Sequence, residues 1–184
     1  MNLQWDPAIR PADENDIGEI LAIYAPYVEQ TTYSFEYTPP TPPVFTQRFR
    51  DHVRQFPWLV WEENGVILGY AYAGAPWERV AYNWVCEVSI YLRPEARGKG
   101  IGRALYAALE AILTRQGYRL AYALITSENT DSVAFHKAVG YEYRTEFPNC
   151  GYKMGRWLGV IWMEKQLNPL GSPTAFPIPW TETL

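Results

Sequence analysis

The sequence predicts a single α/β domain with a central mixed, mostly antiparallel sheet. Asn64-Gly65 is a strong turn signal between two apolar runs, which predicts an antiparallel hairpin. Further along, the helical stretch Ile101–Gln116 separates the apolar runs Val85–Leu92 and Leu120–Thr126. That order is typical of two parallel strands joined by a helical crossover.

The remaining elements follow from periodicity and from residues that end helices. Apolar residues recur at helical spacing from Ile17 to Val28, and Pro26 predicts a kink or early break near Tyr24 because it has no N–H. Further helices are expected at 44–55 and 132–139, the latter ended by Gly140. The expected strands lie at 8–10, 58–62, 66–73, 85–92, 120–126, 141–145 and 157–166. The sheet therefore has about seven strands, with the fourth and fifth parallel.

The last residues differ in composition from the rest of the chain. The domain is expected to span 1–167, and 168–184 forms a Pro-rich tail without periodicity. Phe176 and Trp180 are the tail residues that could dock on the domain.

Charge and composition exclude several classes of protein. The formal net charge of −4 and the absence of a basic tract argue against nucleic-acid binding. Cys86 and Cys150 have neither the number nor the spacing of a disulfide framework or a zinc site. No apolar run reaches the ~18 residues of a membrane span. We therefore expect a cytoplasmic protein without a metal, nucleic-acid or membrane partner.

The segment Arg97-Gly98-Lys99-Gly100-Ile101-Gly102 joins the fourth strand to the following helix. Free N–H groups at a helix start and glycines without side chains suit an anion, and Arg103 adds charge. The spacing fits neither a P-loop nor a dinucleotide fingerprint, which would need glycine at 103. A phosphate site and a simple tight turn both remain open interpretations.

Glu87 lies within an apolar strand, where a carboxylate must be paired or border a cavity. Desolvation there raises the pKa of a carboxyl group and suits it to accept a proton near neutral pH. The alternative is a structural ion pair with Arg97 or Arg144. Cys86 is expected to point to the opposite face and into the core.

The start of the 132–139 helix carries the pattern Asn-x-x-Ser-x-x-x-His, formed by Asn129, Ser132 and His136. Asn129 can act as a helix cap, and His136 can be a packed residue or a chemical group. Both interpretations stay open.

An aromatic-rich connection contains Trp77, Arg79 and Tyr82. With Phe35, whose loop is stiffened by four prolines between 39 and 43, Arg79 could hold the carboxylate of an amino-acid-like substrate. A surface arginine lying over Trp77 and a plain linker are the alternatives.

Taken together, these motifs resemble the GNAT superfamily of N-acetyltransferases, and within it the phosphinothricin and methionine sulfoximine acetyltransferase group. The resemblance covers about 9–167. It rests on Ile-Arg-Pro-Ala at the start, Thr-Tyr-Ser-Phe-Glu before the prolines, Glu-Val-Ser-Ile-Tyr-Leu, the glycine loop, the Asn129 to His136 pattern, Val-Gly-Tyr at 139–141 and Gly-Tyr-Lys-Met-Gly-Arg-Trp from Gly151.

The resemblance implies a GNAT-type fold, with helices on both faces of the sheet, and a direct attack of a primary amine on acetyl-CoA. Glu87 is implied as general base, and His136 stands where many GNAT enzymes have the tyrosine that protonates the thiolate. The implied acetyl-CoA-binding residues are Ile90, Tyr91, Leu92, Arg97, Gly98, Lys99, Gly100, Ile101, Gly102, Arg103, Asn129 and Ser132. The family also implies a homodimer.

One departure concerns the substrate. Phosphinothricin-specific members have a histidine where this chain has Leu158, which leaves the broader expectation of an acceptor that is a small amino-acid-like amine, including methionine sulfoximine and sulfone. Two alternatives are a protein N-terminal or lysine acetyltransferase and a non-catalytic acetyl-CoA-binding module.

Overall fold

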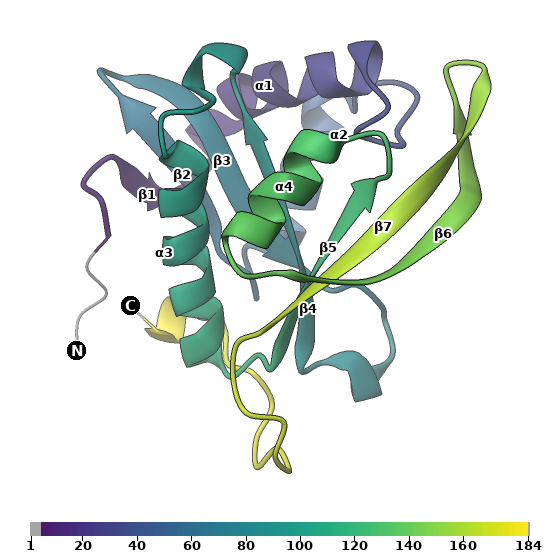
Figure 1. The fold of residues 1–184 in the computed structure, drawn as a ribbon. Helices are drawn as coiled ribbons and strands as arrows, with labels where there is room; N and C mark the ends of the chain where they lie inside the picture. The colour runs from purple at the N-terminus through teal and green to yellow at the C-terminus, as the bar shows by residue number, and fades with distance from the viewer. Residues whose placement is uncertain (1–4, 184) are drawn as a thin grey trace.

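The computed structural model describes residues 5–183 and confirms the predicted mixed sheet (Figure 1). Its seven strands stand in the order β1-β2-β3-β4-β5-β7-β6. Only β4 and β5 run parallel, and every other neighbouring pair is antiparallel. The strands are β1 Ile9–Pro11, β2 Trp58–Glu63, β3 Val66–Gly74, β4 Val85–Leu92, β5 Leu120–Thr126, β6 Glu142–Lys153 and β7 Arg156–Gln166.

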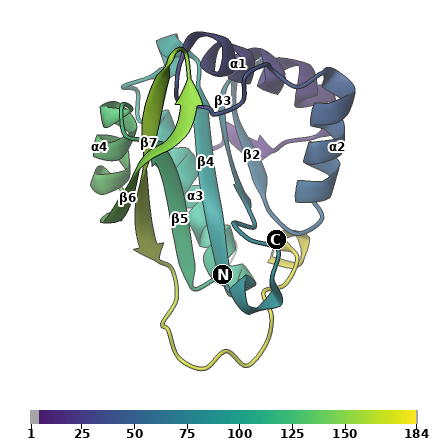
Figure 2. The same cartoon turned by 90° about the vertical axis from the view of Figure 1, so that its right-hand side faces the viewer.

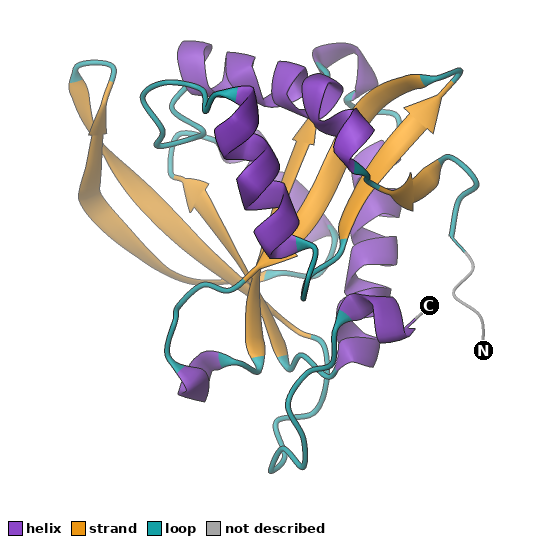
Figure 3. Ribbon diagram, turned by 180° about the vertical axis from the view of Figure 1, so that it is seen from behind, coloured by secondary structure: helices purple, strands orange, loops and turns teal. Residues whose placement is uncertain are grey.

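Helices cover both faces of the sheet, as the side-chain alternation of the central strands requires. The helices α1 Ile17–Gln30 and α2 Pro42–His52 lie on one face, and α3 Ile101–Gln116 and α4 Thr130–Ala138 lie on the other (Figure 2). In β2, Leu59 packs into the core under α3 while Trp58 packs under α1 and α2. Figure 3 shows α1 and α2 from their own side, with the β6–β7 hairpin extending away from them.

Two helix predictions need correction. Of the kink or early break expected near Tyr24, the break is wrong: α1 runs through Pro26 to Gln30, because burial of Ile20, Tyr24 and Val28 on its core side outweighs one missing N–H. The second helix begins at Pro42 rather than at 44 and ends at His52. Its first two residues are prolines, which fit the first turn of a helix because the N–H groups there have no intrahelical partner.

The sixth strand is much longer than the predicted 141–145. It runs to Lys153 and turns into β7 at Met154 and Gly155, which have φ angles of 51° and 77°. Nearly all of its residues are exposed, so the strand has no alternation of buried and exposed side chains that a sequence pattern could reveal.

The parallel pair β4 and β5 separates partway along its length. The paired residues run only from Val85↔Leu120 to Glu87↔Tyr122, although both strands continue well beyond this point. Beyond Glu87, β4 remains paired with β3 alone, and the two parallel strands diverge (Figure 1). One edge of β4 is thereby left open in the middle of the sheet.

The tail docks on the domain through both predicted residues. The Trp180 side chain is buried and donates from Nε1 to the carbonyl of Val53 at 2.8 Å. Phe176 stacks on Trp84 with ring centroids 4.9 Å apart. Within residues 5–183, no helix is long and apolar enough to cross a membrane, and no group of metal-binding side chains is present.

Candidate functional site

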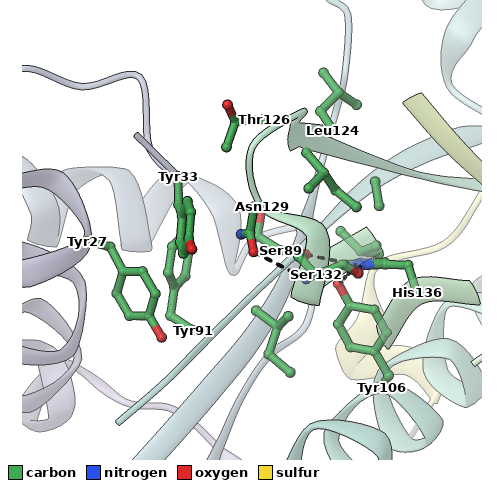
Figure 4. Close-up of a pocket in the computed structure, with 14 residues that line it drawn as sticks. Tyr27, Tyr33, Ser89, Tyr91, Tyr106, Leu124, Thr126, Asn129, Ser132 and His136 are labelled. Carbon is green, nitrogen blue, oxygen red and sulfur yellow. Dashed lines mark hydrogen bonds between the residues drawn. The ribbon is translucent and has the colours of Figure 1, made fainter. Parts of the chain in front are cut away.

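The opening between β4 and β5 contains a small cavity of about 70 Å³ (Figure 4). Ser89 and Tyr91 of β4 and Leu124 of β5 line it, with Tyr33 on the side of α1 and His136 on the side of α4. It adjoins a groove of about 400 Å³ that runs beneath the glycine loop, since Tyr27, Tyr33, Ile90, Asn129 and Ser132 line both. The two spaces form one elongated site.

The glycine loop forms the far end of that groove. Gly98 and Gly100 have φ angles of 73° and 84°, a left-handed conformation that disfavours any residue with a side chain. Gly100 is the N-cap of α3 and provides no side chain to bond the first N–H groups of the helix. The first N–H groups of α3 therefore remain free at the groove, where they and the positive end of the helix dipole favour an anion.

Two further features of the loop concern its packing and charge. A Cβ on Gly102 would lie 3.2 Å from Phe135 and 3.3 Å from Ile90, so this glycine lets α3 approach α4 and β4 closely. The side chains of Arg97 and Arg103 border the groove, whereas Lys99 is exposed and is not among the residues that line it.

The open edge of β4 presents backbone groups to the groove. The N–H and C=O of Leu92 face the Tyr27 hydroxyl, at 3.4 and 2.6 Å, rather than β3. Alternate residues of a strand direct their backbone groups to the same edge, so Ile90 presents its N–H and C=O to the opening. An extended ligand could pair with β4 there as a strand would.

Tyr27 is a site residue that the sequence analysis missed. Its hydroxyl donates to the Leu92 carbonyl and accepts a hydrogen bond from Arg97 at 2.9 Å, and the guanidinium lies 5.6 Å from the Tyr27 ring centroid. Tyr27 therefore holds Arg97 beside the groove. Only its position on the apolar stripe of α1 was visible in the sequence, and a core residue would give the same signal.

Glu87 is half-buried, and its carboxyl group forms no ion pair or hydrogen bond within the described part of the chain. The proposed structural partners are engaged elsewhere, because Arg144 pairs with Glu164 and Arg97 bonds to Tyr27. Burial raises the pKa of the Glu87 carboxyl group above its ordinary value. An unpaired, desolvated carboxylate at the point where β4 and β5 part is suited to accept a proton.

His136 is buried, and both of its ring nitrogens are engaged. Nδ1 lies 2.7 Å from the Ser132 carbonyl, which can only accept, so Nδ1 carries the proton. Nε2 therefore accepts from the Tyr106 hydroxyl at 2.9 Å. Burial lowers the pKa of His136 to about 4, which makes the imidazole neutral near pH 7.

Asn129 caps α4, which confirms the helix-cap interpretation of this residue. Its side-chain oxygen accepts from the N–H of Ser132 at 3.2 Å. The same two residues line both the cavity and the groove, so the cap and the site share them.

The residues predicted to bind the substrate are not gathered into one pocket. Phe35 packs against Gly151 of β6, where an added Cβ would meet its ring. Trp77 contacts Tyr82 and stacks on Trp162 of β7 with centroids 5.5 Å apart. Arg79 is exposed, and its guanidinium forms no hydrogen bond or ion pair within residues 5–183. Phe35 and Trp77 thus lie toward different ends of the β6–β7 ribbon.

Two polar clusters hold the loops around the site, and the sequence analysis predicted neither. Arg156 binds Glu128 through two hydrogen bonds of 2.8 Å, and Thr32 donates to the same carboxylate at 2.9 Å. These bonds lower the pKa of Glu128 to about 2. The buried Lys153 ammonium donates to the carbonyls of Val28 and Ser34. Strand β6, the loop after α1 and the loop before α4 are thereby joined.

The sequence is similar to a known domain family and to individual enzymes of that family. Residues 9–162 match the acetyltransferase (GNAT) domain. A phosphinothricin N-acetyltransferase of Streptomyces viridochromogenes is 37% identical over 83% of this chain and 83% of the relative. An L-methionine sulfoximine/L-methionine sulfone acetyltransferase of Pseudomonas aeruginosa is 36% identical over 90% of this chain and 97% of its own length.

The fold is also similar to that of a solved structure. A GNAT superfamily phosphinothricin acetyltransferase from Sinorhizobium meliloti, solved in complex with acetyl-CoA, superposes with a TM-score of 0.88. It is 37% identical, and the match covers 94% of this chain and 96% of that one.

Proposed function

The chain belongs to the acetyltransferase (GNAT) domain family and is an acetyl-CoA-dependent N-acetyltransferase, and we propose that its acceptor is the primary amine of a small amino-acid-like molecule. Phosphinothricin, methionine sulfoximine and methionine sulfone, which appear in the names of its relatives, are the acceptor types. The observation that carries the proposal is the unpaired Glu87 at the point where β4 and β5 part.

The elongated site fits acetyl-CoA, which supplies an activated acetyl thioester when bound. The N–H groups at the start of α3, with Arg97 and Arg103, would hold its pyrophosphate. The backbone of Ile90 would pair with the pantetheine arm along the open edge of β4, and Asn129 and Ser132 would border it. Lys99, which does not line the groove, would add charge from outside it.

Glu87 would act on the acceptor amine. An amino group is protonated near neutral pH and has no lone pair for attack, so one proton must leave it first. The desolvated Glu87 carboxylate would take that proton, directly or through a water molecule, and the neutral amine would then attack the thioester carbonyl. As the new C–N bond forms, the C–S bond breaks and CoA leaves as the thiolate, which the second proton released from the nitrogen neutralises. Among residues 5–183, no cationic side chain pairs with the Glu87 carboxylate and lowers its affinity for the proton.

We further propose that His136 takes part in thiolate departure as a neutral imidazole that orders Tyr106 and α4. The His136→Phe variant should lower kcat by about tenfold, since it removes the partner of both the Tyr106 hydroxyl and the Ser132 carbonyl. The shape of the pH–rate profile between about pH 6 and 9 should stay the same, because a group with a pKa of about 4 does not titrate there. If one limb of the pH–rate profile disappears in His136→Phe, the proposal that His136 acts as a neutral imidazole is contradicted.

For the acceptor, we propose that its α-carbon and carboxylate lie on the face of the sheet that carries Glu87, between Phe35 and Trp77. Strand alternation directs Glu87 to the face that α1 and α2 cover in part, together with Ser89 and Tyr122. Tyr82 packs on Trp77, and Arg79 would bind the acceptor carboxylate from the same connection.

We propose a homodimer formed through β6. This edge strand and the start of β7 expose large aromatic side chains, which at a free edge favour pairing with another chain. They are Tyr143, Phe147, Tyr152 and Trp157. Light scattering should give a mass of about twice 21.2 kDa. Phe147→Asp should shift the protein toward the monomer, and a wild-type monomer would refute the proposal.

The cellular location follows from the same proposal. Cys86 and Cys150 are both free, which agrees with the cytoplasm that we propose.

The activity is tested by following CoA release with a panel of primary amines. We expect turnover with methionine sulfone, methionine sulfoximine or phosphinothricin, and none with the same compounds acetylated beforehand on nitrogen. Turnover only with peptides or proteins would instead favour an acetyltransferase for protein N-termini or lysines.

A further inference from the structure

A separate cavity of about 140 Å³ lies between the sheet and the helices α1 and α2. Aromatic rings form most of its wall, from Tyr24, Phe45, Trp58, Tyr70 and Tyr72. Trp58 stacks on Tyr72 with ring centroids 4.1 Å apart, and His52 meets Trp58 edge-on at 5.8 Å. The mechanism described above uses none of these side chains.

The cavity contains a polar group without a partner. Trp58 is 3% exposed, and its indole Nε1 has no hydrogen-bond acceptor among residues 5–183. A buried donor without an acceptor is costly and uncommon in a folded protein. By contrast, the other buried tryptophan of β2, Trp61, donates from Nε1 to Glu63 at 2.8 Å. A ligand oxygen would satisfy the donor of Trp58.

The cavity lies beside the proposed base. In the antiparallel pairing of β3 with β4, Gly74 is directly opposite Glu87, and Tyr72 is opposite Ser89. Directly opposed residues direct their side chains to the same face, so the Cβ direction of Gly74 is that of Glu87. His52 Nε2 lies only 2.9 Å from the position of a Cβ on Gly74. The imidazole of His52, part of the cavity wall, therefore covers the residue opposite Glu87.

The spacing of the strands suits an amino-acid side chain. Trp58 pairs with Tyr72, so the cavity floor extends from β3 to β2, about 10 Å from β4 across two strand spacings. An α-amino group held at Glu87 would let an unbranched side chain of methionine length pass His52 and Tyr72 toward Trp58. A short side chain such as that of alanine would not reach it.

The charges around the cavity favour a neutral ligand group. Arg48 also lines the cavity, but it is paired with Glu36, whose second carboxylate oxygen is buried without a partner. His52 Nδ1 lies 3.0 Å from the Arg48 carbonyl and must donate to it, so in the neutral imidazole Nε2 is an acceptor. The aromatic faces are also electron-rich. An anionic group would meet these electron-rich groups, and the charge of Arg48 is already neutralised by Glu36.

We propose that this cavity is the specificity pocket for the acceptor side chain and receives a neutral, oxygen-bearing tip of the sulfone or sulfoximine type, to which Trp58 Nε1 donates. The inference rests on the proposed function, since it assumes that the acceptor amine lies at Glu87. The pocket would discriminate between the two acceptor types that appear in the names of the relatives. The enzyme selects the neutral sulfone over the anionic phosphinate of phosphinothricin.

Binding to the full-length protein saturated with CoA tests the pocket without turnover. Calorimetry is carried out with methionine sulfone, with methionine, which has the same chain without the oxygens, and with phosphinothricin. Wild-type protein should bind the sulfone more tightly than phosphinothricin. Trp58→Phe keeps a ring in the wall and removes the N–H, so it should weaken sulfone binding about five- to tenfold and leave methionine binding unchanged.

Trp61→Phe is the matched control, since it removes the indole of a buried tryptophan on the other face of β2 and should leave all three affinities unchanged. Thermal unfolding checks that both variants are folded. The proposed pocket is refuted if Trp58→Phe binds the sulfone as tightly as wild type does. It is also refuted if the substitution weakens the binding of sulfone and of methionine equally. If none of the three compounds binds the wild type, the pocket also fails, whereas CoA release with any other small amine would still uphold the proposed function.

Discussion

Replacing Glu87 by Gln is expected to lower kcat by about 10²-fold or more while leaving the affinity for acetyl-CoA unchanged. Glutamine keeps the size and one hydrogen-bonding oxygen of the side chain but cannot take a proton from the acceptor. The Glu87 side chain is directed to the face of β4 opposite α3, away from the glycine loop that we propose to hold the pyrophosphate. Steady-state kinetics and equilibrium binding on the same preparation measure the two quantities.

The pH dependence provides an independent test of the same residue. Burial raises the pKa of Glu87, and the base works only when deprotonated, so the rate should fall on the acid side at a higher pH than an exposed glutamate would give. In Glu87→Gln this acid limb should disappear from the residual rate. If Glu87→Gln turns over as fast as wild type, Glu87 is not the general base.

The same raised pKa has a consequence for stability. A carboxyl group whose pKa is higher in the folded than in the unfolded state binds its proton more tightly when folded. Its stabilising effect is present below the unfolded pKa and is lost as the pH rises through the folded pKa. Glu87→Gln should therefore melt at a higher temperature than wild type at neutral pH and lose this advantage in acid, which calorimetry would show.

Replacing Gly100 by Asp is expected to weaken acetyl-CoA binding by about 100-fold. The new carboxylate would lie at the start of α3 beside the proposed pyrophosphate, and two like charges about 5 Å apart at an effective dielectric constant of about 20 repel by ~3 kcal/mol. Nothing lies within 4 Å of the position that a Cβ would take at Gly100, so the side chain fits sterically.

Gly100→Asn is the matched control. Asparagine has the shape of aspartate and the same strain at a φ of 84°, but no charge. It should weaken binding much less than aspartate does. If both variants bind acetyl-CoA equally, the charge at this position does not face the pyrophosphate and the loop is only a tight turn. Titration at several salt concentrations would add a further check, since the penalty from aspartate should shrink as salt increases.

Local sequence signals predicted much of the fold correctly. Asn64-Gly65 marked the hairpin between β2 and β3, and Gly117 and Gly140 marked helix ends because each adopts a positive φ that other residues avoid. The apolar neighbours of Glu87 indicated a desolvated carboxylate. The errors arose where burial competes with local preference, as at Pro26, or where a strand such as β6 is exposed on both faces.

Family membership, the glycine loop and the candidate base were determined by the sequence, because each depends on residues close together in the chain. Only the tertiary structure showed where β4 leaves β5, how Tyr27 holds Arg97, and that His52 covers Gly74 opposite Glu87. These contacts join residues far apart in sequence, and no local spacing encodes them. The cavity at Trp58 depends on such packing: its wall comes from α1, α2, β2 and β3, which meet only in the folded chain.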